Sequence, residues 1–452
     1  MLQVQTLPAS LAALLQVFRS CFTGPSFATF AALTAGLVAQ PGAGTVCGML
    51  VGAGLSRVWH HSRAHWFFAG ARWGADRVGV ALLGLITARL LPAGEPVLVA
   101  VDDTLFRRSG RRVHAAAWHH DGSAKGPGKQ DKVSWGNCWV IAGVVVALPF
   151  IDRPVCLPVT AALWRKGGPT KQVIAGRLVS AIAAACPGRQ VHVTADAWYA
   201  GAAGAAGAAK GATRARAWPE GVTLTSRLRV NASFRGIAEP VPGARGRARR
   251  IGGKLGCPKD LAAAAAWATA RLRRYGRDEA VHLAETVCLW YGVYRSRAIR
   301  VVLVREPGSR AKNGYHLALV TTDLHSPAAQ IVERYAARWS VEVAIEDAKQ
   351  ITGVGQARNR VRRAVERTVP FGLYTQSLVI VWYAQHGHRP DIAERRRQAA
   401  PWYQTKTQPS YLDMITALRR VLIAARFLAG NPRTPTPEET RAVQMAWAQA
   451  AA

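Results

Sequence analysis

The sequence predicts an α/β protein in which a helical N-terminal region precedes a sheet-containing core. Two apolar runs, 97–101 and 191–195, each end in an aspartate, Asp102 and Asp196. Between these runs lie residues with the pattern of two further strands and one helix. A long helical pattern at 326–353 follows a β-rich segment. This order favours one mixed sheet that is covered by helices on both faces.

Residues 1–92 are expected to be entirely helical. Glycine and proline turns separate four apolar segments of helical length. These segments are 8–18, 26–40, 43–58 and 74–91. The chain carries no charge between Arg19 and Arg57, which exceeds the length of a membrane span. Because Pro25, Pro41 and several glycines interrupt this stretch, we expect buried helices there and no membrane segment.

The core is expected to contain five strands. Residues 97–104 are apolar on both faces, which indicates a central strand that is covered on each side. The next two strands fall within 133–160 and turn near Leu148–Pro149, and residues 170–186 have helical apolar spacing. The fourth and fifth strands are 191–196 and 222–229.

A β-rich segment at 230–323 is expected to interrupt this core. It contains a short alanine-rich helix that Asp260 caps and that ends near Gly276. Three strands follow, at 286–295, 298–306 and 315–323. Ahead of the segment, the low-complexity residues 200–212 suggest a weak helix.

The stretch 326–353 is predicted to be one long helix, which starts at Ser326–Pro327 and stops at Gly353. A break at Trp339–Ser340 is the alternative. At about 100° per residue, a polar stripe lies beside the apolar stripe that faces the core. The polar stripe contains Tyr335, Arg338, Glu342, Glu346 and Lys349. Glu342 and Glu346 repel each other in a bare helix, and a divalent cation or basic partners would relieve this repulsion.

The charge balance favours a polyanionic partner. The chain has 59 Lys and Arg against 26 Asp and Glu, a net charge of +33. Such a field is typical of proteins that bind nucleic acid. Nucleotide binding is not expected, because the glycine-rich loop after residue 104 lacks the GxxxxGK[ST] pattern. Seven scattered cysteines without a CxxC pair indicate reduced thiols in a cytosol.

The spacing of four polar residues carries a resemblance to a known family. Tyr335, Arg338, Glu342 and Lys349 are separated by two, three and six residues. This spacing resembles the Tyr-Arg-Glu-Lys signature of one group of DDE insertion-sequence transposases, bacterial enzymes that move DNA by cut-and-paste. The resemblance covers about 95–385. It implies a ribonuclease H-like catalytic core with a β-rich insertion ahead of the glutamate.

The resemblance also assigns the chemistry. The implied catalytic and metal-binding carboxylates are Asp102, Asp196 and Glu342. They would hold two Mg²⁺ ions, for which Mn²⁺ substitutes, because hard divalent cations prefer carboxylate oxygens. The family's Asp-x-Thr pattern is met by Asp102 and Thr104, while the arginine that commonly follows the second aspartate is absent. Asp103 and Glu346 stay open as replacements for Asp102 and Glu342.

Further side chains are expected to bind DNA. The resemblance implies that Tyr335, Arg338 and Lys349 hold phosphates near the reacting strand end. Two basic segments add phosphate contacts. These contacts come from Arg245, Arg247, Arg249, Arg250, Arg358, Arg360, Arg362 and Arg363. Trp198 and Trp339 are candidates for stacking on an unpaired base, with burial in the core as the alternative.

The resulting hypothesis is a DNA transposase that works in the cytoplasm, at the bacterial nucleoid. As a homodimer, it would bind the terminal inverted repeats of its own element, cleave the ends and join them to double-stranded target DNA. Two alternatives stay open. One is a non-catalytic repressor or architectural DNA-binding protein derived from a transposase. The other is a ribonuclease H-like nuclease that takes no part in transposition.

The predicted domains follow the same division. They are a helical DNA-binding domain at 1–92, a ribonuclease H-like core at 93–229 and 324–385, a β-rich insertion at 230–323, and a helical C-terminal region at 386–452. Within the last parts of the chain we expect a buried helix at 370–385 and an amphipathic helix near 410–429.

Overall fold

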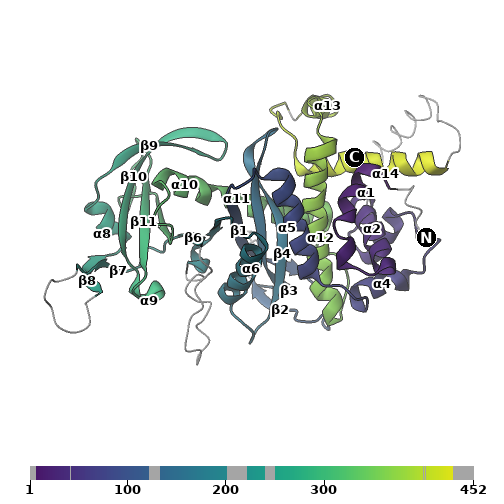
Figure 1. Cartoon of the computed structure of the whole chain (residues 1–452), viewed down its shortest axis with the longest axis horizontal. Helices are drawn as coiled ribbons and strands as arrows, with labels where there is room; N and C mark the ends of the chain where they lie inside the picture. Colours follow the sequence, from purple (N-terminus) through teal and green to yellow (C-terminus); the bar gives the residue numbers. More distant parts are fainter. Residues whose placement is uncertain are drawn as a thin grey trace.

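The computed structural model describes residues 7–40, 42–121, 133–200, 221–239, 250–400, 402 and 404–430. Within these ranges, twelve strands form one continuous sheet that runs through most of the molecule (Figure 1). At one end of the molecule, strands and a few short helices form a β-rich lobe. At the other end, helices from both the beginning and the end of the chain gather beside the sheet. Most of the weak helix predicted at 200–212 lies outside the described residues.

The central part of the sheet has the predicted strands. They are β1 (Val97–Arg107), β3 (Val133–Leu148), β4 (Ile151–Trp164), β5 (Val191–Ala195) and β6 (Val222–Arg227). In space they follow the order β4-β3-β1-β5-β6, with antiparallel pairing on the β3 side of β1 and parallel pairing on the β5 side. This mixed topology is consistent with the predicted ribonuclease H-like core. A short strand, β2 (Ala117–His120), pairs antiparallel with the start of β3 and was not predicted.

The β-rich segment continues the same sheet, because β6 pairs antiparallel with β12. Its strands are β7 (Phe234–Ile237), β8 (Ile251–Gly256), β9 (Ala268–Arg274), β10 (Arg277–Leu289), β11 (Ala298–Arg305) and β12 (Leu317–Thr321). Strands β11 and β12 confirm two of the predicted strands. The strand predicted at 286–295 is partly wrong, since β10 ends at Leu289 and a short helix, α9 (Tyr291–Tyr294), follows.

The helix predicted to end near Gly276 is also shorter than expected. Helix α8 (Pro258–Ala263) stops early, and β9 and β10 then form a hairpin. Tyr275 and Gly276 both have positive φ, at 55° and 78°. Two such residues in a row are typical of the tight turns that join antiparallel strands. Alanines therefore suggested a helix where turn geometry and strand pairing decide the structure.

The first ninety residues are helical in their described part, as predicted. The helices are α1 (Ala9–Gln16), η2 (Arg19–Cys21), α2 (Gly24–Ala39), α3 (Val46–Gly52), α4 (His61–Ala69) and α5 (Ala75–Leu90). Thr23 and Thr45 cap α2 and α3 by accepting hydrogen bonds from the backbone N–H groups of Ser26 and Gly48. Such caps satisfy N–H groups that the helix itself leaves unpaired.

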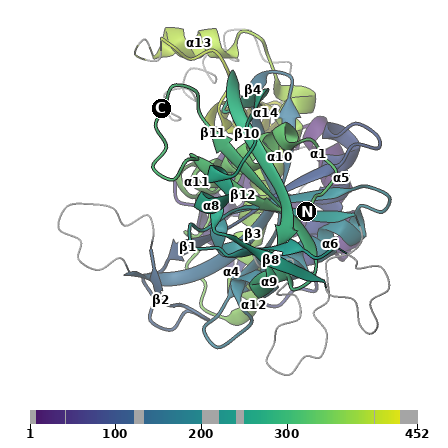
Figure 2. The ribbon, with the colours of Figure 1, turned by 90° about the vertical axis from the view of Figure 1, so that its left-hand side faces the viewer.

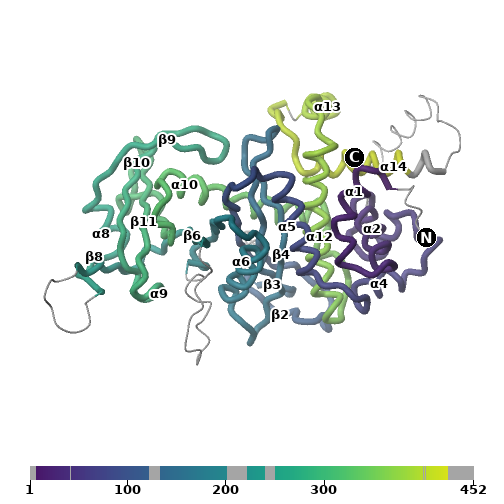
Figure 3. The backbone as a smooth tube through the Cα atoms, in the orientation of Figure 1, coloured from purple at the N-terminus to yellow at the C-terminus, as the bar shows by residue number. Residues whose placement is uncertain are grey.

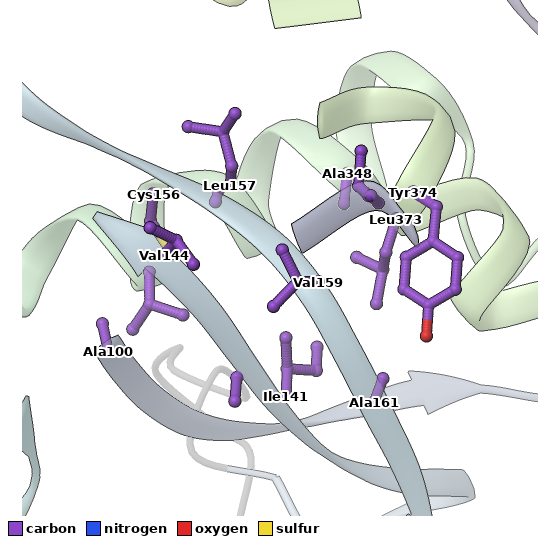
Figure 4. Close-up of a cluster of buried hydrophobic side chains, with 14 of the residues drawn as sticks. Ala100, Ile141, Val144, Cys156, Leu157, Val159, Ala161, Ala348, Leu373 and Tyr374 are labelled. Carbon is purple, nitrogen blue, oxygen red and sulfur yellow. The ribbon is translucent and has the colours of Figure 1, made fainter. Parts of the chain in front are cut away.

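These N-terminal helices share one hydrophobic core with the central sheet. Helix α5 packs on β4 so closely that a Cβ on Gly79 would stand 2.2 Å from the carbonyl oxygen of Val159. Helix α12 (Arg362–Trp382) packs against α4, α5 and β4. Figure 4 shows part of this core, where Val159 and Ile141 of the sheet face Leu373 of α12. The helix predicted at 370–385 thus begins earlier, at Arg362, and contains Pro370.

The stretch at 326–353 is helical but has one irregularity. Helix α10 (Ala328–Ala337) and helix α11 (Trp339–Asp347) meet at Arg338, and a π-helical turn, η4 (Ala348–Thr352), ends at Gly353 in the left-handed conformation. Pro327, rather than Ser326, occupies the N-cap position. Helix α10 packs on the β-rich lobe, whereas α11 packs on β1 and β4 of the core. The helix pair therefore connects the two lobes, and Figure 1 shows α10 and α11 between them. In Figure 2 the β-rich lobe faces the viewer, in front of the core.

Three helical elements complete the described chain. They are η5 (Tyr383–Gly387), α13 (Ile392–Ala399) and α14 (Tyr411–Gly430). The helix predicted at 170–186 is α6 (Lys171–Ala185), which Thr170 caps. Helix α14 confirms the predicted amphipathic helix and packs against α2 and α12 (Figure 3). Helix α13 was not predicted. Among the described helices, none is long and apolar enough to cross a membrane.

Candidate active site

The two predicted aspartates belong to neighbouring parallel strands: Asp102 lies inside β1, and Asp196 directly follows β5. Val101 of β1 lies beside Ala195 of β5, so Asp102 and Asp196 come next at the same level of the sheet. Asp196 caps a short helix, η3 (Ala197–Tyr199), by accepting a hydrogen bond from the backbone N–H of Trp198 at 2.8 Å. The parallel register, which joins segments almost a hundred residues apart, thus brings the two carboxylates to one place.

Arg338 connects Asp102 with the predicted glutamate. Its Nη1 atom lies 3.2 Å from Oδ2 of Asp102, and its Nη2 atom lies 2.6 Å from Oε1 of Glu342. Because Arg338 sits at the junction of α10 and α11, one turn of helix separates it from Glu342. The guanidinium therefore holds together two carboxylates from segments more than two hundred residues apart.

The neighbouring aspartate has a different environment. Lys171 of α6 contacts Oδ2 of Asp103 at 2.5 Å, and the Tyr199 hydroxyl donates to Oδ1 at 2.8 Å. Successive strand residues point to opposite faces, so Asp102 turns towards α11 and Asp103 towards α6. Burial alone would lower the pKa of Lys171, but the hydrogen bond and charge of Asp103 raise the pKa above its usual value. Asp103 therefore interacts with Lys171 and Tyr199 on the other face of the sheet, and not with Arg338.

The two glutamates of α11 also differ. Glu342 is half-buried against Arg338, whereas Glu346 is exposed and accepts a hydrogen bond from Gln350 at 3.0 Å. Glu342 is therefore the glutamate that lies beside Asp102. The geometry favours the assignment made on sequence spacing over the alternative at Glu346.

Lys349 and Tyr335 lie on either side of Arg338 along the polar stripe. The Nζ atom of Lys349 donates to the hydroxyl of Thr104 at 2.6 Å and lies 5.5 Å from the ring centroid of Phe106. The Arg338 guanidinium carbon lies 5.9 Å from the ring centroid of Tyr335. Both residues of the Asp-x-Thr pattern thus contact residues of the four-residue signature.

The surroundings of Asp102 disfavour its ionised form. Burial raises the pKa of Asp102 to about 7, even though Arg338 acts in the opposite direction. The neighbouring charges of Asp103 and Asp196 raise the pKa further. Burial disfavours an ionised carboxyl unless a cation lies close to it. A second cation beside Arg338 would therefore favour the ionised form of Asp102.

The predicted stacking residues are on the surface. Trp198 is 55% exposed and Trp339 is 54% exposed, so the alternative of core burial is wrong for both. The Arg229 guanidinium carbon lies 5.5 Å from a ring centroid of Trp198. Both indoles are close to site residues in the sequence: Trp198 is two residues after Asp196, and Trp339 directly follows Arg338.

The predicted basic contacts fall into two groups. Arg358, Arg360, Arg362 and Arg363 are exposed on the segment between η4 and the start of α12. Hydrogen bonds from Arg108, the residue after β1, hold this segment in place. Its guanidinium donates to the carbonyl oxygens of Gly355 and Ala357 at 2.9 and 2.5 Å. Arg250 is exposed beside β8 in the β-rich lobe. Arg245, Arg247 and Arg249 lie outside the described residues.

A comparison with protein families now bears on this geometry. The profile of a family described as DDE superfamily endonuclease matches residues 17–292, well over half of the chain. The chain belongs to this family. The match includes Asp102 and Asp196 and ends before Glu342. A search among curated proteins finds no match for this endonuclease.

Family membership makes this chain a DDE-type, transposase-like endonuclease that acts on DNA, and such endonucleases generally use divalent metals. In the described ranges, no three Asp, Glu, His or Cys side chains form a cluster that could hold a metal ion as they stand. The donor set nevertheless fits a hard cation, because all three predicted ligands are carboxylates. Two of them already share one cationic group, Arg338.

Sequence reasoning missed three side chains that support the site of this endonuclease. Lys171 and Tyr199 hold Asp103, and Arg108 fixes the segment that carries the exposed arginines. Burial lowers the pKa of Arg108 to about 10. No local pattern marks these residues, because each acts on a partner far away in the sequence. In the sequence, Arg108 is one of several basic residues in a loop, and nothing distinguishes it from the others.

Proposed function

We propose that this endonuclease is a DNA transposase of the cut-and-paste type, whose catalytic residues are Asp102, Asp196 and Glu342. It binds the terminal inverted repeats of its own insertion sequence, cleaves the element ends and joins them to target DNA. The observation that carries this proposal is the shared contact of Arg338 with Asp102 and Glu342, beside the strand end that bears Asp196. The four-residue signature and its contacts with the Asp-x-Thr pattern support it further.

Two Mg²⁺ ions, or Mn²⁺ in their place, would be held by these three carboxylates. Bound there, the metal would lower the pKa of an attacking water or hydroxyl and would offset the negative charge that develops on the leaving oxygen of a phosphodiester. Strand β1, the end of β5 and α11 are rigid supports, which favour a fixed arrangement of ligands. Glu342 would exchange its contact with Arg338 for the metal.

The basic residues of the signature bind and orient the DNA. Arg338 offers a planar fork that suits a phosphate, and Lys349 offers a point charge. Once freed from Asp102 and Glu342, Arg338 can hold a phosphate next to the reacting strand end. Trp198 and Trp339, both exposed, can stack on a base that leaves the duplex at that end. Exposed Arg358, Arg360, Arg362 and Arg363 would contact the backbone of the same duplex.

The direct test uses the DNA that flanks the coding region. The purified chain is incubated with Mg²⁺ and a linear DNA that carries the flanking inverted repeats, or with the same DNA in which the repeats are scrambled. We expect cleavage at the repeat ends and joining of the released 3′ ends to a second DNA. Binding without cleavage would favour the repressor alternative, and cleavage that ignores the repeats would favour a nuclease outside transposition.

A further inference from the structure

A second basic site lies apart from the catalytic carboxylates. A pocket of about 410 Å³ opens between the turn that joins α4 to α5 and the first two turns of α12. Four arginines line it, namely Arg72, Arg77, Arg363 and Arg367. No acidic residue is among its lining residues. Of this set, Arg363 was among the predicted phosphate contacts.

Two of the four arginines are held in place by the backbone. The Arg367 guanidinium donates to the carbonyl oxygens of Phe68 and Trp73, at 3.1 and 2.5 Å, and lies 4.8 Å from a ring centroid of Trp73. Arg77 donates to the carbonyl oxygen of Ser20 at 3.1 Å. These bonds fix two positive charges at the wall of the pocket and leave other N–H groups of each guanidinium for a further acceptor.

The other two arginines, Arg72 and Arg363, are exposed and have no such bond to the described backbone. Within the described part of the chain, the side chains of Arg72 and Arg363 make no ion pair and no hydrogen bond. Glu366, the acid beside Arg367 in the sequence, pairs with Arg362 at 3.1 Å. The pocket thus presents side chains that can rearrange around an incoming anion between two that are fixed.

The positive charges that line this pocket repel one another. Burial lowers the pKa of Arg367, the charge of Arg363 one helical turn away lowers it further, and Glu366 offsets part of the effect. The first turn of α12 carries Arg362 and Arg363 and contains no acid, and no side chain caps its N-terminus. Positive side chains at the positive end of a helix dipole are unfavourable, whereas an anion there is favourable. An anion in the pocket would remove both sources of repulsion.

We propose that this pocket binds a backbone phosphate of duplex DNA at a distance from the cleaved end. The proposal rests on the proposed function, because it places a second anchor on the same DNA. Only fourteen positions along the chain separate Lys349 of the catalytic site from Arg363. The segment between them carries exposed Arg358, Arg360 and Arg362, and its Arg360 carbonyl oxygen accepts a hydrogen bond from the backbone N–H of His114. This segment forms a basic path from one site to the other.

The test compares two double variants that remove the same charge. Arg72→Gln with Arg363→Gln changes the pocket, and Arg89→Gln with Arg177→Gln changes exposed arginines of α5 and α6 that do not line it. Arg89 lies at the opposite end of α5, a helix about 24 Å long. Binding of a short fluorescent duplex of random sequence is measured by anisotropy between about 50 and 200 mM salt. Thermal melts check that each variant folds.

We expect the pocket variant to bind the duplex about tenfold more weakly, with a salt slope that is smaller by about one, while the control matches the wild type. Equal affinities and slopes for the two variants would overturn this inference alone. Failure of the wild-type chain to bind any duplex would overturn the proposed function as well. Titration with inorganic phosphate separates the sources: if phosphate binds the pocket while duplex affinity is unchanged in the variant, the site serves a free anion and not DNA.

Discussion

At the residue scale, adjacent carboxylates on β1 have different partners and therefore different expected roles. Asp102 contacts Arg338, which also holds Glu342. Asp103 contacts Lys171 and the Tyr199 hydroxyl on the other face of the strand. A carboxylate that an ammonium and a hydroxyl both hold is a poor candidate for the metal, whereas Asp102 can exchange its one guanidinium partner for a metal ion.

This difference predicts opposite results for two matched substitutions. Asp103→Asn should lower the free energy of unfolding by about 1–3 kcal/mol, because the half-buried Lys171 ammonium loses its carboxylate. Its Mg²⁺-dependent cleavage should stay close to that of the wild type. Asp102→Asn should abolish cleavage with little loss of stability. Urea denaturation and a cleavage assay on both variants measure the contrast, and the reverse pattern would assign the catalytic role to Asp103.

A second group of buried residues links the core to the β-rich lobe. His192 of β5 bonds the Thr223 hydroxyl at 2.7 Å and lies 3.8 Å from Asp323, whose ion-pair partner is Arg334 of α10 at 3.0 Å. Burial lowers the pKa of His192 to about 4, the charge of Arg334 lowers it further, and Asp323 offsets part of the effect. Burial alone would raise the pKa of Asp323, but hydrogen bonds from Ser326 and His325 hold it well below its usual range.

This environment predicts an acid-sensitive fold. The unfolded chain protonates His192 near pH 6.5, whereas the folded chain resists until about pH 4. The unfolded state therefore binds more protons between these values, and stability falls as the pH drops through this window. The loss from this one group is up to about 3 kcal/mol. Unfolding free energies measured at pH 7 and pH 4.5 should differ less in His192→Asn than in the wild type. An equal difference in both proteins would contradict this account.

At the element scale, two glycines of α5 have different surroundings, which depend on how this helix packs against the sheet. Gly79 faces β4, where any Cβ would collide with the backbone of Val159, and Gly84 of the same helix has nothing within 4 Å of that position. The sequence pattern of α5 predicted a helix but gave no sign of which glycine is in contact. Such close approach depends on a strand eighty residues further along the chain.

The two glycines therefore predict opposite effects. Gly79→Ala should destabilise the chain by about 1–3 kcal/mol, because the added methyl group overpacks a rigid contact. Gly84→Ala should stabilise it by about 0.5–1 kcal/mol, since alanine is the better helix former at an exposed position. Denaturant titration of both variants checks this. If the two substitutions have the same effect, α5 does not pack on β4 in this register.

The elements that the sequence predicted well have a strong local signal. Strands β1, β3, β4 and β5 are apolar runs, and α6 and α2 begin at threonine caps. The β-rich lobe was predicted less well, because the hairpin of β9 and β10 depends on pairing and on the positive φ values of Tyr275 and Gly276. The start of α12 was misplaced since proline favours the first turn of a helix, whereas Pro370 lies inside this one.

At the scale of the whole molecule, the sheet is the frame on which distant residues meet. The sequence indicated three acids on a strand, at a strand end and on a helix. It could not show that β6 pairs with β12, so that the β-rich lobe continues the core sheet. It left a break at Trp339–Ser340 open, and α10 and α11 meet one residue earlier, at Arg338. The sequence could not show that one of these helices packs on the β-rich lobe and the other on the core.

This arrangement predicts that the four-residue signature depends on both lobes. Tyr335 packs against the apolar cluster of the β-rich lobe, while Glu342 and Lys349 lie over β1 of the core. The position of Arg338 between them is thus a property of the complete fold. The DNA-binding and catalytic parts of the signature should act only when the two lobes are joined in one sheet.

The central claim is that Asp102, Asp196 and Glu342 form one catalytic site. The most direct measurement is the rate of Mg²⁺-dependent DNA cleavage by Asp102→Asn, Asp196→Asn and Glu342→Gln, with Glu346→Gln as the matched control on α11. We predict that each of the three rates falls by at least about a thousandfold, which corresponds to about 4 kcal/mol, while DNA binding persists and the control cleaves like the wild type. A wild-type rate in any of the three, or a loss only in Glu346→Gln, would contradict the account.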